Sequence, residues 1–262
     1  MRQIGVRKSG ARSLGADYVA KSAPNGRTLL AVSSPHYANK SIYPKLPFDP
    51  VKDFRAVAGY GEACLGLVVP EDSPFKKIQD LVTFAQANPG KLTYSSSGNG
   101  AVTHLAAAEF LSRAHATAVH VPYKGGDGAV ADVAANQISF TFAPLTAVVP
   151  LVEGRRMRLL AVSSARRVAS VPHVPTVAES GFPGYEVVSF FGFLVPAATP
   201  DDRIAALSRA MVAIAKTNQF VDFATLRGFS VHVTDSVEFG KTRQAEMEHW
   251  AALVAKSGAK QE

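Results

Sequence analysis

The stretch "KLTYSSSGNGAVTHLAAAEF", residues 91–110, decides the fold of this chain. Residues 91–97 predict a β-strand, the serines and glycines of 94–100 predict a tight turn, and the alanine-rich residues 101–114 predict a helix. A strand, a short loop of small residues and a helix form the first half of a βαβ unit. The stretch therefore indicates an α/β protein.

The same succession of strands and helices continues on both sides of this stretch. Further strands are predicted at 27–34, 64–70, 118–123, 138–143 and 157–164, and further helices at 78–90, 128–137, 147–156, 200–218 and 236–258. Alternating strands and helices favour parallel pairing, because each helix returns the chain to the starting edge of the sheet. The order predicts mainly parallel sheets with helices on both faces.

Composition narrows the functional classes. With 262 residues, 47% of them hydrophobic, the chain can bury a core as one large domain or two small ones. A single cysteine, Cys64, excludes an intramolecular disulfide and a structural CxxC zinc site. The net charge of +7 comes from scattered Lys and Arg residues without a nucleic-acid-binding motif, so a solvated basic surface is the preferred interpretation.

The loop Tyr94–Gly100 allows two interpretations. In an open parallel sheet, ligands lie beyond the carboxyl ends of the strands, where helix N-termini offer unpaired N–H groups to an anion. The loop is either such an anion site or a tight turn whose serines only cap the helix. It is not the G-x-S-x-G elbow of a serine hydrolase, and it lacks the lysine of a P-loop.

The titratable residues do not form an evident catalytic or metal site. His104, in the helix after the loop, is interpreted as packed against Tyr94 or Glu109; the alternative is a histidine that faces the loop. The other histidines fall in separate segments without an HExxH pattern, namely His36, His115, His120, His173, His232 and His249. No metal site is therefore predicted.

Four segments resemble one known family. They are "SIYPKLPFDPVKDFRAVA" (41–58), "ANPGKLTYSSSGNGAVTHLAAAEF" (87–110), "HVPYKGGDGAVADV" (120–133) and "VPHVPTVAESGFPGYEVVSFFGFLVPAATP" (171–200). Together they resemble the Bug-type solute-binding receptors of tripartite tricarboxylate transporters, collinearly from Gly15 to Gly258. The resemblance implies a type II periplasmic-binding-protein fold, with two lobes of mainly parallel sheets and a ligand cleft between them. The first lobe is expected to comprise 1–70 plus 188–262, and the second lobe 71–187.

The resemblance also implies a function without chemistry. Family members capture small carboxylates or related metabolites and deliver them to a pair of membrane permease subunits. The chain is accordingly expected to be a periplasmic monomer that is not an enzyme and that uses no cofactor, metal or nucleic acid. Its implied ligand contacts are Ser96, Ser97, Gly98, Asn99, Gly100, Tyr123, Lys124 and Gly125 in the second lobe, and Ser34, Pro35 and His36 in the first. Lys124 stays open between an ion pair with the ligand and a solvated lysine beside a glycine turn.

The start of the sequence departs from the family pattern. Members begin with a signal peptide, a first strand and a glycine-rich ligand loop, whereas this chain shows no apolar signal segment and has "SGAR" at 9–12 in place of "GAGG". The resemblance thus predicts an N-terminally incomplete first lobe and impaired binding. Two explanations stay open: Met1 is an internal methionine of a longer reading frame, or the chain is a degraded paralogue.

Two other functional classes remain. An α/β hydrolase or transferase would need a nucleophile with a base in reach, and a cytosolic ligand-sensing domain would use the same fold without a transporter. Stabilisation by small dicarboxylates without product formation separates a binder from an enzyme.

Overall fold

The computed structural model describes residues 14–34, 36–37, 46–226 and 229–257. The chain forms two compact units. Unit 1 comprises Met1–Gly61, Phe190–Phe223 and Val231–Ala251, and unit 2 comprises Glu62–Ser189, Ala224–Ser230 and Ala252–Glu262. The strands β2 (Phe54–Pro70) and β7 (Val188–Pro196) contribute residues to both units.

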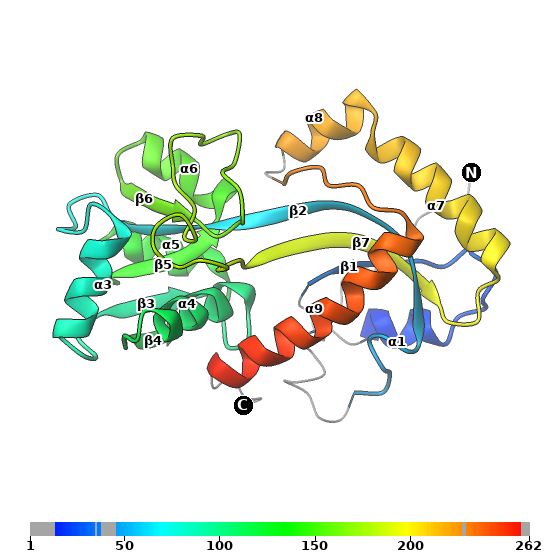
Figure 1. Cartoon of the computed structure of the whole chain (residues 1–262), viewed down its shortest axis with the longest axis horizontal. Helices are drawn as coiled ribbons and strands as arrows, with labels where there is room; N and C mark the ends of the chain where they lie inside the picture. Colours follow the sequence, from blue (N-terminus) through cyan, green and yellow to red (C-terminus); the bar gives the residue numbers. More distant parts are fainter. Residues whose placement is uncertain (1–13, 35, 38–45, 227–228, 258–262) are drawn as a thin grey trace. The chain divides into compact units, whose positions relative to one another are not determined.

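Unit 2 contains a mixed sheet in the order β4-β3-β5-β2-β6. Strand β3 (Thr93–Ser96) pairs in parallel with β4 (Val119–Pro122) and with β5 (Phe140–Pro144). Strand β2 pairs antiparallel with β5 and with β6 (Met157–Val162). The succession of strands and helices predicted from the sequence is present (Figure 1).

Strand direction corrects one expectation. Mainly parallel pairing was expected, but β2 runs against both of its neighbours in unit 2. Strands β5 and β6, joined by helix α6 (Leu145–Glu153), do point the same way, as a βαβ crossover requires. The antiparallel pairs arise because β2, from an earlier part of the chain, lies between them.

Four helices of unit 2 bury alanine and larger apolar side chains. They are α3 (Ile78–Ala87), α4 (Val102–Arg113), α5 (Gly126–Ala134) and α6. Helix α4 buries Leu105 and Phe110, and the Phe110 ring lies 5.9 Å from that of Phe142 in β5. Burying each of these side chains contributes roughly 1.5–3 kcal/mol. Between them, Ala106 and Ala107 let the helix backbone approach the sheet closely.

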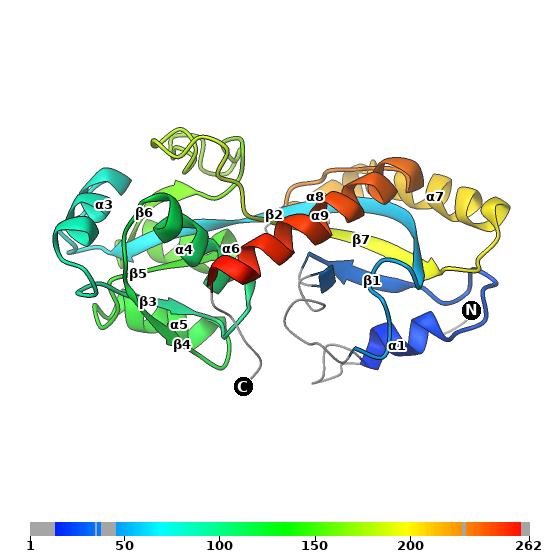
Figure 2. The same cartoon turned by 60° about the horizontal axis from the view of Figure 1, so that its bottom comes forward.

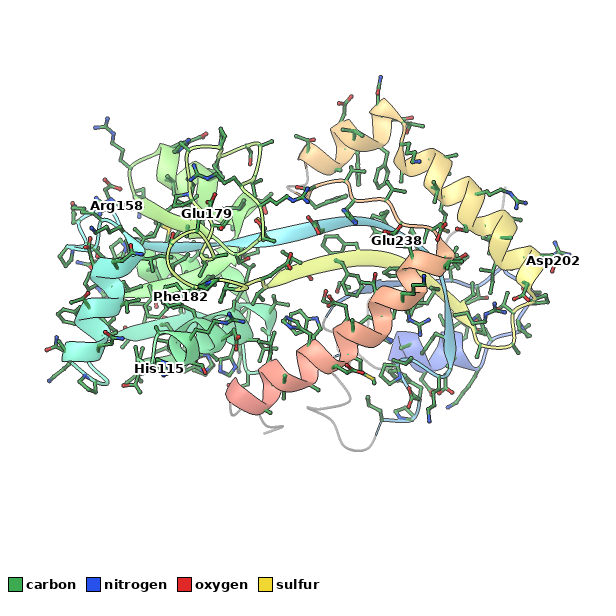
Figure 3. All side chains as sticks on the ribbon, viewed as in Figure 1. His115, Arg158, Glu179, Phe182, Asp202 and Glu238 are labelled. Atoms are coloured by element: carbon green, nitrogen blue, oxygen red, sulfur yellow. The ribbon has the colours of Figure 1, made fainter. Side chains whose placement is uncertain are left out.

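Two ion pairs of unit 2 each contain one residue that Figure 3 labels, Arg158 or Glu179. Arg158 in β6 donates to the Glu71 carbonyl oxygen at 2.6 Å and to the Glu71 carboxylate at 3.3 Å. In the segment after β6, Arg167 donates to the Glu179 carboxylate at 2.9 Å. Both pairs are partly solvated, so they fix loop geometry more than they add stability.

Unit 1 is built around an antiparallel pair. Strand β1 (Leu30–Ser33) pairs with β7. The helices of this part are α1 (Leu14–Ala20), α7 (Asp201–Ala215), α8 (Asn218–Leu226) and α9 (Ser236–Ser257). The last residues of α8 and of α9 belong to unit 2. Helices α1 and α7 lie on opposite sides of β7 in Figure 1 and in Figure 2. The Phe239 ring of α9 lies directly over Gly192, where a Cβ atom would come within 2.2 Å of it.

Candidate functional site

The loop between β3 and α4 is held by hydrogen bonds within itself and to the first turn of α4. The Ser97 amide donates to Thr103 Oγ1 at 2.9 Å, the Gly98 amide to Ser96 Oγ at 3.2 Å and the Gly100 amide to His104 Nδ1 at 3.2 Å. Gly98 has φ +130° and Gly100 has φ +68°, conformations that favour glycine. The loop therefore has a defined shape before any ligand is considered.

These bonds determine which backbone N–H groups of the loop are left for an anion. The amides of Ser97, Gly98 and Gly100 already have protein acceptors. Helix α4 begins at Val102, and its N-cap residue Ala101 makes no side-chain capping bond in the described structure. The first N–H groups of a helix have no intrahelical acceptor, so the α4 N-terminus offers donors to an anion.

The second junction, from β4 to α5, lies beside the first. The Tyr123 amide donates to the Ser96 carbonyl oxygen at 3.0 Å, and a Cβ atom on Gly98 would lie 3.3 Å from the Tyr123 carbonyl oxygen. Because β3 and β4 are parallel, with Ser96 paired to Pro122, their carboxyl ends meet at one edge of the sheet. The structure thus brings Ser96–Gly100 and Tyr123–Gly125 together, as the sequence suggested.

Tyr123 is held against helix α5, which follows it in the chain. Its hydroxyl donates to the Asp132 carboxylate in α5, and its ring rests 3.2 Å from the position of a Cβ atom on Gly128. The hydrogen bond to Asp132 raises the pKa of Tyr123. Next to it, Lys124 is exposed and Gly125 has φ +123° at the N-cap of α5. The Tyr123 hydroxyl is therefore bonded within the protein. The backbone of the turn and the edge of the Tyr123 ring are left for contact with a ligand.

Two histidines lie behind the serine loop. His104, from α4, and His120, from β4, stack with ring centroids 4.0 Å apart, and Tyr94 stacks on His120 at 4.8 Å. His104 also stacks with Tyr94 at 6.2 Å, as the first interpretation expected, and its Nδ1 atom faces the loop, as the alternative expected. Burial and the neighbouring His120 lower the pKa of His104 to about 4, and burial lowers the pKa of His120. Both rings are therefore neutral at neutral pH.

His120 was not singled out from the sequence, yet it makes the shortest side-chain contact of the loop. Its Nε2 atom lies 2.7 Å from Ser96 Oγ. This is the spacing of a serine and its base, but Ser96 is fully buried, and in the described residues His120 makes no hydrogen bond to a carboxylate. The pair therefore supports the loop and lacks the exposed nucleophile of a hydrolase. The contact between His120 and Ser96 follows from the pairing of His120 with Tyr94 across the two strands. That pairing depends on strand register.

The residues expected in the first lobe have structural partners. The buried Ser34 hydroxyl accepts from the Phe190 amide at 2.9 Å, and His36 Nε2 donates to the Pro50 carbonyl oxygen at 3.2 Å. The His36 ring stacks on Phe48 at 5.9 Å, and burial lowers its pKa to about 4. Pro35 lies outside the described residues. Ligand contact by these three residues stays a prediction.

Neither a metal centre nor a membrane span emerges from the described residues. They contain no group of three or more His, Cys, Asp or Glu side chains arranged to hold a metal ion. Among the described helices, none combines the length and the hydropathy that a bilayer-spanning segment needs.

The fold and the paired strand-to-helix junctions define a class, the periplasmic-type solute-binding proteins. Among solved structures with this fold, the R. palustris protein Rpa4515 with adipate superposes with a TM-score of 0.81 at 28% identity, over 95% of this chain and 84% of that one. The type II periplasmic-binding-protein fold expected from the sequence is thereby confirmed.

The chain belongs to the family of tripartite tricarboxylate transporter receptors (TctC), whose model matches residues 4–259. A UPF0065 protein of Pseudomonas sp. (strain P51) is 36% identical over 196 residues, 74% of this chain and 58% of that protein. BugT of Bordetella pertussis is 28% identical over 249 residues, 94% of this chain and 76% of BugT. The resemblance to Bug-type receptors is confirmed, and this chain spans less than two thirds of the Pseudomonas relative.

Proposed function

We propose that this protein is an extracytoplasmic solute-binding receptor that captures a small carboxylate and passes it to the permease subunits of a tripartite tricarboxylate transporter. The observation that carries the proposal is the side-by-side placement of the β3–α4 and β4–α5 junctions, where Tyr123 donates to the Ser96 carbonyl oxygen. Two helix N-termini at one sheet edge favour a negatively charged ligand. Membership of the receptor family and the adipate named with the R. palustris protein support a carboxylate.

The proposed contacts follow from the geometry and the family resemblance. In the turn Tyr123–Gly125 the Tyr123 amide is already used, so Lys124 and Gly125 supply the backbone donors. The loop Ser96–Gly100 places the first amides of α4 toward the ligand. Lys124, which is exposed, is available as a counter-charge. Ser34, Pro35 and His36 are proposed as contacts from the first lobe on the resemblance alone. The protein acts in the periplasm as a monomer and performs no chemical step.

Thermal unfolding with a panel of four- to six-carbon dicarboxylates tests this function. A ligand that binds only the folded state stabilises it by RT ln(1 + [L]/Kd), about 2.7 kcal/mol at a hundredfold excess over Kd. We expect at least one member, with adipate tested first, to raise the melting temperature and to be recovered unchanged by NMR. Conversion of the dicarboxylate would instead support an enzyme, and a panel without any stabilising member would overturn the carboxylate proposal.

A further inference from the structure

The five-residue loop Ser96–Gly100 is anchored at both ends by the same pair of stacked rings. At its start, Ser96 Oγ is hydrogen-bonded to His120 Nε2 at 2.7 Å. At its end, the Gly100 amide donates to His104 Nδ1 at 3.2 Å. The two rings contact each other face to face, with centroids 4.0 Å apart and planes 12° apart. Neither bond involves an atom that the proposed ligand contacts require.

The rings themselves are fixed by the sheet. Tyr94 in β3 is the register partner of His120 in β4 and of Phe140 in β5, so these three rings form a cross-strand ladder on one face. Tyr94 stacks on His120 at 4.8 Å and on Phe140 at 5.6 Å. Helix α4 brings the buried His104 onto the same ladder. Cross-strand aromatic pairs of this kind restrict ring orientation.

Ser96 connects the stacked rings to the rest of the loop through its hydrogen bonds. Its hydroxyl accepts from the Gly98 amide at 3.2 Å and lies 3.2 Å from the Gly98 carbonyl oxygen, while its own carbonyl oxygen accepts from the Tyr123 amide at 3.0 Å. A displacement of Ser96 would therefore reach Gly98 on one side and the β4–α5 turn on the other. The residue connects both junctions of the candidate site.

We propose that His104 and His120 form a histidine clamp that positions the ligand-binding loop without touching the ligand. Each residue acts on one end of the loop, His120 through Ser96 and His104 through Gly100, and their mutual stacking couples the two ends. The clamp rests on the proposed function, because it fixes the direction in which the α4 N-terminus and the Tyr123 turn present their donors. Its chemical requirement is an acceptor at His104 Nδ1 and a hydrogen-bonding atom at His120 Nε2.

Four substitutions separate the hydrogen bonds from the packing. His104→Phe and His120→Phe keep an aromatic ring in the stack and remove the nitrogen. His104→Asn places a carbonyl oxygen near the position of Nδ1, and His120→Gln places a polar atom near that of Nε2. His173→Phe, at an exposed histidine of the same unit, is the control.

Amide hydrogen exchange of the full chain, followed by NMR without ligand, tests the clamp. We expect the Gly100 amide in His104→Phe to exchange about tenfold faster, since it loses its acceptor and opens locally. The Gly98 amide should exchange about tenfold faster in His120→Phe, because its acceptor Ser96 Oγ loses its anchor. The Asn and Gln variants restore slow exchange, and the β5 amides stay protected throughout. Unchanged exchange in both Phe variants, or loss of protection across all of unit 2, would overturn the clamp.

Adipate titration of the same variants tests its role in binding. We expect about tenfold weaker binding in the Phe variants and near-native binding in the Asn, Gln and His173→Phe variants. If the wild-type chain binds no dicarboxylate, the proposed function fails while the exchange data still decide on the clamp. If the Phe variants lose loop protection but bind adipate as tightly as the wild type, the positioning role is wrong.

Discussion

At Gly98 the backbone and the surrounding space impose the same requirement. The residue has φ +130°, and a Cβ atom there would lie 3.3 Å from the Tyr123 carbonyl oxygen. A β-branched side chain is strained by this φ and presses on a backbone atom that cannot move aside easily. The position therefore selects glycine for two independent reasons.

Replacing Gly98 with valine should weaken carboxylate binding at least about tenfold, because the loop must rearrange and move the donors of α4. Calorimetric titration measures the effect. Gly90→Val is the matched control, since Gly90 also has positive φ, at +73°, but has open space around its α-carbon and lies before β3. Equal affinity of the wild type and Gly98→Val would remove the loop from the binding site.

The buried histidines predict a pH dependence of stability. Burial lowers the pKa of His36 and of His104 to about 4, whereas each titrates near 6.5 in the unfolded chain. Between these values the unfolded state binds more protons than the folded state, so the free energy of unfolding falls as the pH is lowered from about 6.5 to about 4. Above this window both states hold neutral histidines and this dependence disappears.

Chemical denaturation between pH 7.5 and pH 4.5 measures this slope. For His36, the loss between pH 6.5 and pH 4 is about 3 kcal/mol. We expect the double variant His36→Phe, His104→Phe to show a shallower slope than the wild type, whatever its absolute stability. The exposed His173→Phe should keep the wild-type slope. Parallel slopes in the wild type and the double variant would show that other groups control acid unfolding.

At the scale of single elements, the close approach of α9 to β7 depends on one missing side chain. A Cβ atom on Gly192 would lie 2.2 Å from the Phe239 ring and 2.9 Å from the Ala58 carbonyl oxygen. The ring could turn away, but the carbonyl belongs to β2 and is fixed by its strand. Even alanine is therefore too large at this position.

Gly192→Ala should destabilise the protein by about 1–3 kcal/mol, the usual cost of overpacking a tight contact. Gly15→Ala is the control, because Gly15 lies in α1 with nothing within 4 Å of its added Cβ atom. That change should be neutral or stabilising by up to about 1 kcal/mol. Thermal melts of both variants measure the effect. Equal melting temperatures of Gly192→Ala and Gly15→Ala would contradict the contact between α9 and β7.

The elements that carry the candidate site could be predicted because their boundaries are marked locally. Serine and glycine residues follow β3, glycines follow β4, and alanines recur within α4 and α5. The first half of β2 was missed because Gly59 and Gly61 interrupt its apolar run, and α8 was missed because nine residues give little periodicity. The role of His120 could not be predicted, since it depends on the register of β3 with β4.

At the scale of the whole molecule, the succession of elements predicted the fold class but not every strand direction. Alternating strands and helices correctly predicted β3, β4 and β5 as parallel neighbours. The place of β2 between β5 and β6 follows from contacts distant in sequence, such as Gly66 with Ala143 on one side and Val162 on the other. Local patterns do not encode such pairings, which is why the antiparallel direction was not foreseen.

The route of the chain through the two units also sets an order of events during synthesis. Unit 2 takes its whole sheet from the continuous stretch Glu62–Ser189, whereas unit 1 is assembled from three stretches, the last of which ends at Ala251. A chain growing from its N-terminus can thus complete the unit 2 sheet on the ribosome while β1 still lacks β7 and α9. Strand β1 therefore keeps unpaired backbone groups until β7 has been made, after the unit 2 sheet is complete. A chaperone that holds this nascent protein before β7 emerges would therefore bind unit 1 and find the unit 2 sheet already formed.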